Sequence, residues 1–149
     1  MPPAVHDELL GPLTWDEERS WWTFEVGPIA GRPVRGLIIP EDRRVPLARV
    51  QLGAVRACVA WIRANEPAVR EFITHKSFDW WMKAWYDDEI DQVNTPQGFR
   101  ETIQLGGVNF YEDGKACMCY KDGGLLGGHS LWVTVGPGGV FEHGPELVG

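Results

Sequence analysis

Residues 103–142, IQLGGVNFYEDGKACMCYKDGGLLGGHSLWVTVGPGGVFE, contain apolar runs separated by short turn signals. The turn signals are Asp113-Gly114, Asp122-Gly123 and residues 136–139, and the apolar runs are residues 103–111, 115–120, 125–135 and 140–142. Asp-Gly between apolar runs is a strong hairpin signal, because both residues tolerate the positive φ of a tight turn. This stretch therefore predicts a C-terminal β-meander.

The N-terminal part of the chain also predicts strands. A short one covers residues 13–15, and in residues 21–26 the large apolar residues Trp22, Phe24 and Val26 recur at every second position. That period is typical of a half-buried strand. Another apolar strand, residues 34–39, follows the turn residues 27–33 and ends at Pro40.

Between the two β regions the apolar period changes to 3.6 residues, which predicts helices. The first helix should begin near Pro46 and end near Asn65, and Pro67 should open a second, because proline fits the first turn of a helix. A capped helical turn is predicted from Thr95 to about Thr102. The predicted core stripe of the second helix is Val69, Phe72, Ile73, Trp80 and Ala84.

These elements predict the α+β fold class, with an antiparallel sheet (N-terminal strands plus C-terminal β-meander) packed against a two-helix layer. No linker rich in Pro, Gly or Ser divides the 149 residues, so we expect a single domain over residues 1–149. The ends, about residues 1–12 and 143–149, lack a repeating apolar pattern and are expected to be mobile.

The net charge of −7 restricts the partners that the chain can bind. It opposes binding to the phosphate backbone of nucleic acid and makes a basic protein partner more plausible, although the solubility of an acidic surface explains the same charge. No stretch approaches the ~20 apolar residues that cross a bilayer, and the N-terminus lacks the layout of a signal peptide, so we expect a cytoplasmic protein without membrane contact. The three cysteines form an odd set and should remain reduced.

Eight tryptophans exceed what a core of this size requires. In a regular second helix, Phe78, Trp81 and Trp85 share a face roughly opposite to the predicted core stripe. Such an aromatic face needs a cover. The cover could be the chain's own Trp15 to Trp22 segment with residues 87–95, or a partner; alternatively, Ser77 breaks the helix and returns the aromatics to the core.

Two acidic runs adjoin these tryptophans, at residues 16–18 and 87–89. These runs are either ordinary solvated loop charge or part of an interface in which tryptophan supplies binding energy and the charges steer a basic target. The expected partner-binding residues are Asp16, Glu17, Glu18, Trp81, Trp85, Asp87, Asp88 and Glu89.

No motif predicts catalytic residues, a metal or a cofactor. Cys117, Cys119 and His129 could be metal ligands or a Cys–His pair, but C-x-C alone lacks the spacing and the fourth ligand of structural zinc. We interpret the cysteines as small apolar residues of a strand. The glycine-rich residues 123–128 lack the Gly-Lys-Ser/Thr ending of a phosphate loop and predict a bulged or wide hairpin, with His129 at its rim.

Several short motifs resemble a family of small bacterial proteins of unknown function. They are Gly11-x-Leu13-x-Trp15-Asp16-Glu17-Glu18 followed by Trp21-Trp22, then Gly31-Arg32-Pro33-Val34, Phe110-Tyr111-Glu112-Asp113-Gly114 and Gly128-His129-Ser130. Some members of that family are presumed immunity proteins encoded near polymorphic-toxin genes. The resemblance implies no catalytic residue for this chain.

The sequence therefore favours a cytoplasmic, non-catalytic protein-binding domain. The resemblance adds the expectation of an immunity protein that blocks a basic toxin domain with an acidic, Trp-rich surface. Two other hypotheses stay open: a small hydrolase acting on carbohydrate or another small substrate, and a structural or regulatory module that associates with itself. Paired carboxylates in a deep pocket would favour the hydrolase.

Overall fold

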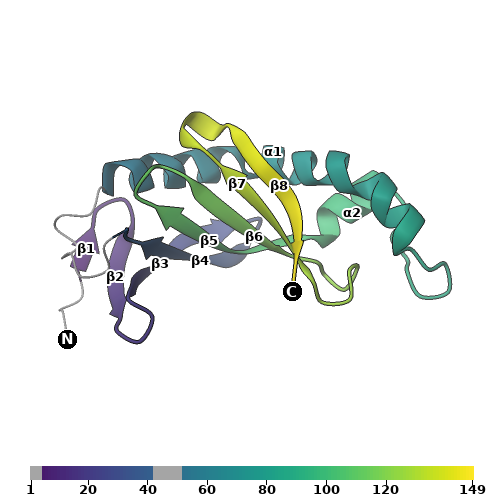
Figure 1. Cartoon of the computed structure of the whole chain (residues 1–149), viewed down its shortest axis with the longest axis horizontal. Helices are drawn as coiled ribbons and strands as arrows, with labels where there is room; N and C mark the ends of the chain where they lie inside the picture. Colours follow the sequence, from purple (N-terminus) through teal and green to yellow (C-terminus); the bar gives the residue numbers. More distant parts are fainter. Residues whose placement is uncertain (1–4, 42–51) are drawn as a thin grey trace.

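The computed structural model describes residues 5–41 and 52–149, and it confirms the α+β class. Within this part of the chain, eight strands form one sheet in chain order (Figure 1). They are β1 (Val5–Asp7), β2 (Gly11–Asp16), β3 (Trp21–Ile29), β4 (Arg32–Ile39), β5 (Gln104–Tyr111), β6 (Ala116–Lys121), β7 (Ser130–Val135) and β8 (Phe141–Val148). The helices are α1 (Leu52–Ala84), α2 (Pro96–Thr102) and a short 3₁₀ turn, η2 (Pro137–Gly139).

The strand pairing is antiparallel except between β4 and β5. These two strands are parallel because the long connection through α1 carries the chain back along the sheet before β5 begins. The predicted C-terminal meander is confirmed, since β5 to β8 pair in sequence order. The Thr95 cap of α2 is also present, with its hydroxyl accepting the Gly98 N–H at 3.0 Å.

The core lies between α1 and one face of the sheet, and α1 runs along the length of the molecule (Figure 1). The helix contributes Val55, Val59, Ile62, Val69 and Ile73. The strands contribute alternate residues, as expected for a sheet with one packed face. They are Trp22, Phe24, Val26, Val34, Ile38, Val108, Phe110, Met118, Tyr120, Leu131 and Val133.

The predicted helix break between Asn65 and Pro67 is wrong, because α1 continues through Pro67 as one 33-residue helix. A proline inside a helix costs roughly 3 kcal/mol. Buried side chains on both sides of it, Ile62 and Val69, pack on the sheet and outweigh that cost. The expected start near Pro46 lies outside the described residues.

A buried polar cluster fixes the middle of α1 on the sheet. The carboxylate of Glu66 accepts the hydroxyl of Tyr120 at 3.0 Å and the guanidinium of Arg70 at 2.9 Å. Burial, followed by the nearby Glu66 charge, raises the pKa of the Tyr120 hydroxyl, so this group stays protonated and donates to Glu66. The cluster therefore pairs a buried charge with two donors, as a core position requires.

Within the described residues, β1 and β2 near the N-terminus and β8 near the C-terminus are paired strands, where the sequence predicted mobile ends at about residues 1–12 and 143–149. At the N-terminal end, the Asp7 carboxylate accepts the backbone N–H groups of Leu9 and Leu10 and pairs with Arg56 of α1. Main-chain pairing and this ion pair do not depend on a repeating apolar pattern, so the sequence shows no period there. No described helix is both long enough and apolar enough to cross a membrane.

Candidate functional site

The C-terminal end of α1 carries an exposed aromatic and acidic surface. We define the acidic aromatic end as Trp80, Trp85, Asp88, Glu89 and Ile90. The Trp80 side chain is 44% exposed and Ile90 is 77% exposed, whereas Trp85 is half-buried. The rings of Trp80 and Trp85 lie 6.3 Å apart between centroids, so they form one aromatic surface, and the acidic residues follow Trp85 closely in the chain.

Trp81 anchors this end of the helix and is not part of its surface. Its side chain is 0% exposed, and its indole N–H donates to the carbonyl of Leu125 at 2.9 Å. Phe99 of α2 and Tyr86 pack against the same ring, at centroid distances of 5.5 and 5.6 Å. The expectation that Trp81 contacts a partner is therefore wrong.

The error comes from the helix phase. The buried stripe in the second half of α1 includes the polar residues Glu66, Thr74 and Ser77, so a search for regularly spaced apolar residues does not detect it. This buried stripe includes Trp81 and not Trp80. α1 has no break at Ser77, and Phe78 and Trp81 are covered by Phe99 and Tyr86, not by the Trp15 to Trp22 segment.

The glycine-rich loop between β6 and β7 contacts the end of α1 through Trp81 and Trp85. The buried carboxylate of Asp122 accepts the N–H groups of Gly124, Leu126 and Gly128, at 2.8–3.1 Å. Burial of the carboxylate opposes its ionisation, but these N–H groups more than offset that effect and lower the pKa of Asp122. The loop thereby holds Leu125 for Trp81 and places His129 edge-on to Trp85, at 5.7 Å.

This loop also corrects the predicted strand over residues 125–135, since β7 begins at Ser130. The N–H groups that a longer strand would offer to the sheet are taken up by Asp122 instead. The alternative of a wide hairpin at the glycine-rich residues fits the structure, and half-buried His129 lies at its end.

The acidic turn after α1 is ordered partly by its own side chains. The Asp87 carboxylate accepts the N–H of Glu89 at 3.0 Å, and that of Asp91 accepts the N–H of Asp87 at 2.8 Å. Asp88 and Glu89 are exposed, and their side chains make no hydrogen bond or ion pair with the described residues. These two carboxylates are therefore available to a partner, whereas Asp87 shapes the turn.

The other acidic run lies at the opposite end of the long axis, in the turn between β2 and β3 (Figure 1). Glu17 and Glu18 are exposed there, and Asp16 pairs with Arg19 at 3.3 Å. Hydrogen bonding from the Arg19 backbone N–H is the main reason that the pKa of Asp16 is lowered. Since α1 spans roughly 50 Å at 1.5 Å per residue, the two runs do not form one surface.

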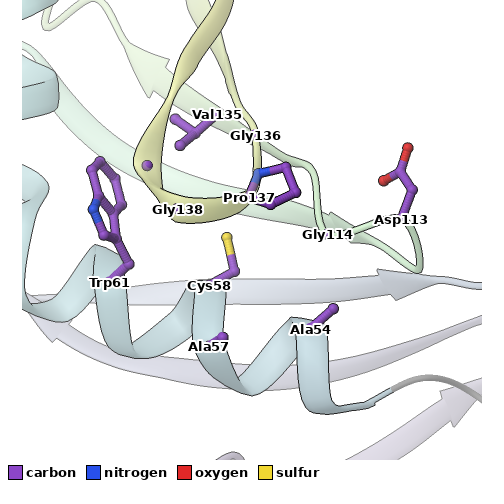
Figure 2. A pocket seen from close by; sticks show the side chains of 11 residues that line it. Ala54, Ala57, Cys58, Trp61, Asp113, Gly114, Val135, Gly136, Pro137 and Gly138 are labelled. Atoms are coloured by element: carbon purple, nitrogen blue, oxygen red, sulfur yellow. The ribbon is translucent and has the colours of Figure 1, made fainter.

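Figure 2 shows a second candidate site, a cavity of about 350 Å³ between the first turns of α1 and the β7–β8 hairpin. Its walls are largely small residues, with Trp61 at one side and the Cys58 sulfur directed toward Pro137. Burial raises the pKa of the Cys58 thiol to about 11, so at neutral pH it is a small apolar group and not a nucleophile. The full lining is Ala54, Ala57, Cys58, Trp61, Asp113, Gly114, Val135 and Gly136 to Gly139.

The chemistry of this cavity does not favour a hydrolase. Asp113 is the single carboxylate among the described lining residues, and it accepts the N–H of Lys115 at 3.0 Å. Glycoside hydrolysis in its usual form needs two carboxyl groups flanking the scissile bond. Elsewhere, Cys117 and Cys119 lie side by side on β6, and the described residues contain no group of three or more His, Cys, Asp or Glu side chains that could hold a metal.

Trp80 and Ile90 are the surface residues that sequence reasoning missed. The apolar period places Trp80 on the core stripe, and Ile90 falls in an acidic loop. The sequence signal for Ile90 is a lone isoleucine between four acidic residues, Asp87, Asp88, Glu89 and Asp91. Comparison with protein-family models, curated proteins and solved structures found no match to this chain.

Proposed function

We propose that this chain is a non-catalytic, cytoplasmic protein-binding domain whose partner docks on the acidic aromatic end. The observation that carries the proposal is the exposed Trp80, whose ring lies against Trp85, followed shortly in the chain by two exposed carboxylates, Asp88 and Glu89, that have no partner among the described residues. A large exposed aromatic beside unpaired charges is the composition of an interface hot spot with a polar rim.

Preorganisation supports the same proposal. The hydrogen bond from Trp81 to Leu125 and the packing of Phe99 hold the helix end, while Asp87 and Asp91 hold the turn that follows it. A surface that is already ordered loses little conformational entropy when a partner binds. Trp80 and Trp85 are thus presented on a rigid element, as an anchor for a partner should be.

The charge of this surface favours a basic partner. Asp88 and Glu89 belong to a chain whose net charge is −7, so the long-range field accelerates encounter with a positively charged protein. We propose further that this partner is a toxin domain and that the chain is its immunity protein, occupying the basic active site of the toxin. The family resemblance of the sequence motifs supports this finer proposal.

Affinity capture with matched variants tests the proposal. The bait is the full chain as wild type, as Asp88→Lys/Glu89→Lys, and as Glu17→Lys/Glu18→Lys, which makes the same charge change at the opposite end. We expect one basic protein to be captured stoichiometrically by the wild type and the Glu17/Glu18 variant, and lost from the Asp88/Glu89 variant. Raising the salt from 0.1 to about 0.5 M should also weaken capture, because salt screens exposed charges.

Three results would contradict the proposal: no captured protein, an acidic partner, or equal loss with both charge variants. Trp80→Ala adds an independent test, because loss of an anchor should abolish capture without a change in charge. If light scattering instead shows a homodimer that Trp80→Ala dissociates, the chain is a self-associating module. Expression of the captured protein with and without this chain then tests immunity, and the proposal expects growth arrest that the chain relieves.

A further inference from the structure

The face of the sheet opposite α1 carries a hollow that neither the core nor the acidic aromatic end uses. The strand register places Arg35, Gly107, Cys119 and Trp132 in one row across β4 to β7. Facing residues on paired strands project to the same side of a sheet. Because Val108 and Met118 next to this row point into the core, the row itself lies on the opposite face.

Two consecutive glycines of β5 form the floor of this hollow. Gly107 places no side chain between Arg35 and Cys119, and a Cβ atom on Gly106 would lie 2.9 Å from the side chain of Lys121. The cavity measures about 280 Å³. We call it the sheet hollow, and its lining residues are Arg35, Leu37, Gly106, Gly107, Val108, Asn109, Cys119, Lys121, Ser130 and Trp132.

The charge of the sheet hollow is opposite to that of the chain. Its described lining includes two basic residues, Arg35 and Lys121, and no acidic one, although the chain as a whole carries −7. Glu25 faces Arg35 across the β3–β4 pair, but the two side chains form no ion pair. Neither Arg35 nor Lys121 makes an ion pair or side-chain hydrogen bond within the described part of the chain.

The hollow also offers apolar contact area. Leu37 and Trp132 are half-buried on this face, and Ile39 and Tyr111 continue it at one side. A sheet that packs a helix on one face usually presents polar residues on the other. Strand β4 is instead apolar on both faces, with Val34 and Ile38 toward the core and Leu37 and Ile39 away from it.

We propose that the sheet hollow binds an acidic segment of a protein partner. Two carboxylates of that segment pair with Arg35 and Lys121, and an apolar side chain between them packs against Leu37 and Trp132. The two cations stand on β4 and β6, two strand spacings or about 10 Å apart across the sheet and about 7 Å apart along it, which suits two carboxylates of a peptide better than one phosphate. Nucleic acid is disfavoured because the net charge of −7 repels its backbone.

This site is independent of the acidic aromatic end, because it selects the opposite charge. It exists whether or not a basic partner binds at the end of α1. If both surfaces engage one protein, that protein carries a basic region and an acidic, apolar-containing segment.

An NMR titration of the ¹⁵N-labelled full chain tests the inference. The probe is an acetylated, amidated peptide, Glu-Phe-Glu-Leu-Glu-Phe, and the matched probe replaces each Glu by Lys. We expect shifts of the backbone amides at residues 35–37, 106–109 and 119–121 and of the Trp132 indole with the acidic peptide, and none there with the basic one. Arg35→Glu/Lys121→Glu should weaken binding at least about tenfold.

A control variant, Arg32→Glu/Lys76→Glu, makes the same charge change at exposed residues outside the hollow and should alter affinity less than about threefold. Gly107→Ala provides a second test that keeps the charge. Its Cβ would lie 3.4 Å from the Arg35 carbonyl, so the chain should fold, yet the methyl group enters the floor of the hollow and should weaken binding.

The inference is overturned if millimolar acidic peptide causes no shifts at the hollow, or if the lysine peptide binds equally well. It is also overturned if the Arg35/Lys121 variant, folded by circular dichroism, keeps wild-type affinity. Displacement of the peptide by low-millimolar inorganic phosphate would assign the hollow to a small anion, and tighter binding of oligothymidylate would assign it to nucleic acid; both results reject a protein segment as its ligand.

Discussion

The indole N–H of Trp81 donates to the backbone carbonyl of Leu125 at 2.9 Å, and this hydrogen bond joins the end of α1 to the glycine-rich loop. The same loop places His129 against Trp85 and is held by the carboxylate of Asp122. The exposed surface around Trp80 therefore rests on two buried supports. One is its sequence neighbour Trp81, and the other is the glycine-rich loop between β6 and β7. Trp80 and Trp81 are adjacent in the chain, but Trp80 is exposed and Trp81 is buried.

Trp81→Phe should destabilise the fold by about 2–4 kcal/mol, because it leaves the Leu125 carbonyl without its donor and creates a cavity. Trp80→Phe makes the same chemical change at an exposed position and should cost less than about 0.5 kcal/mol. Urea unfolding followed by far-UV circular dichroism measures both values. Equal losses of unfolding free energy for the two variants would contradict the burial of Trp81 and the exposure of Trp80.

Tyr120→Phe should cost about 1–3 kcal/mol, because it removes the hydroxyl donor from the buried Glu66 carboxylate and leaves Arg70 as its remaining side-chain donor. Tyr86→Phe is the control, since Tyr86 is half-buried and packs on Trp81 through its ring. We expect the control to change the unfolding free energy by less than about 0.5 kcal/mol. A stabilised Tyr120→Phe variant would mean that Glu66 does not need this donor.

The Asp7 carboxyl should make stability depend on pH in the acid range. Hydrogen bonding from Arg56, followed by the Leu10 and Leu9 N–H groups, overcomes burial and lowers the pKa of Asp7 from 3.8 to about 2. A lowered folded-state pKa stabilises the chain above the unfolded value, and this contribution disappears as the pH falls from about 4 to about 2. Solvent around the partly exposed Arg56 screens this ion pair and reduces the stabilisation that Asp7 provides at neutral pH.

Asp7→Asn should therefore reduce stability at pH 7 by about 2 kcal/mol, and its difference from the wild type should shrink as the pH approaches 2. Asp79→Asn, at an exposed carboxyl on α1, should change the stability at pH 7 by less than about 0.5 kcal/mol. Urea titrations at several pH values measure these differences. A constant Asp7→Asn difference between pH 7 and pH 2 would contradict the ion pair.

Gly123→Ala should destabilise the chain more than Gly124→Ala. Both glycines have positive φ, 62° and 91°, so each alanine pays a conformational cost of about 1 kcal/mol. A Cβ on Gly123 would also lie 2.5 Å from the Thr102 carbonyl, whereas one on Gly124 meets no atom within 4 Å. Thermal unfolding separates the two effects, and equal melting temperatures would show that Thr102 moves aside at no cost.

Local signals predicted the local structure well. Asp-Gly pairs located two hairpins, alternation located β3, and Thr95 located the start of α2. The β4–β5 pairing was not predicted. These parallel strands are separated in the sequence by all of α1, so no turn signal between them indicates that they pair. Pro67 is a strong local helix breaker, but the packing of α1 on the sheet overrides it.

The candidate site was predicted in part. The exposure of the carboxylates Asp88 and Glu89 was predictable, because acidic side chains remain in solvent. The exposed tryptophan was misplaced by one residue, since polar Glu66 and Ser77 occupy core positions through contacts that the sequence does not reveal. The sheet hollow was missed for a related reason: it depends on strand register across four strands, which a sequence pattern does not specify.

Hydrogen–deuterium exchange of the full chain, alone and saturated with the captured partner, locates the docking surface. We expect protection in the last turn of α1 and the acidic turn, residues 79–91, with unchanged exchange in residues 16–20 at the other end. Protection confined to residues 16–20, or the absence of any change in residues 79–91 in a saturated complex, would contradict the claim that the partner docks on the acidic aromatic end.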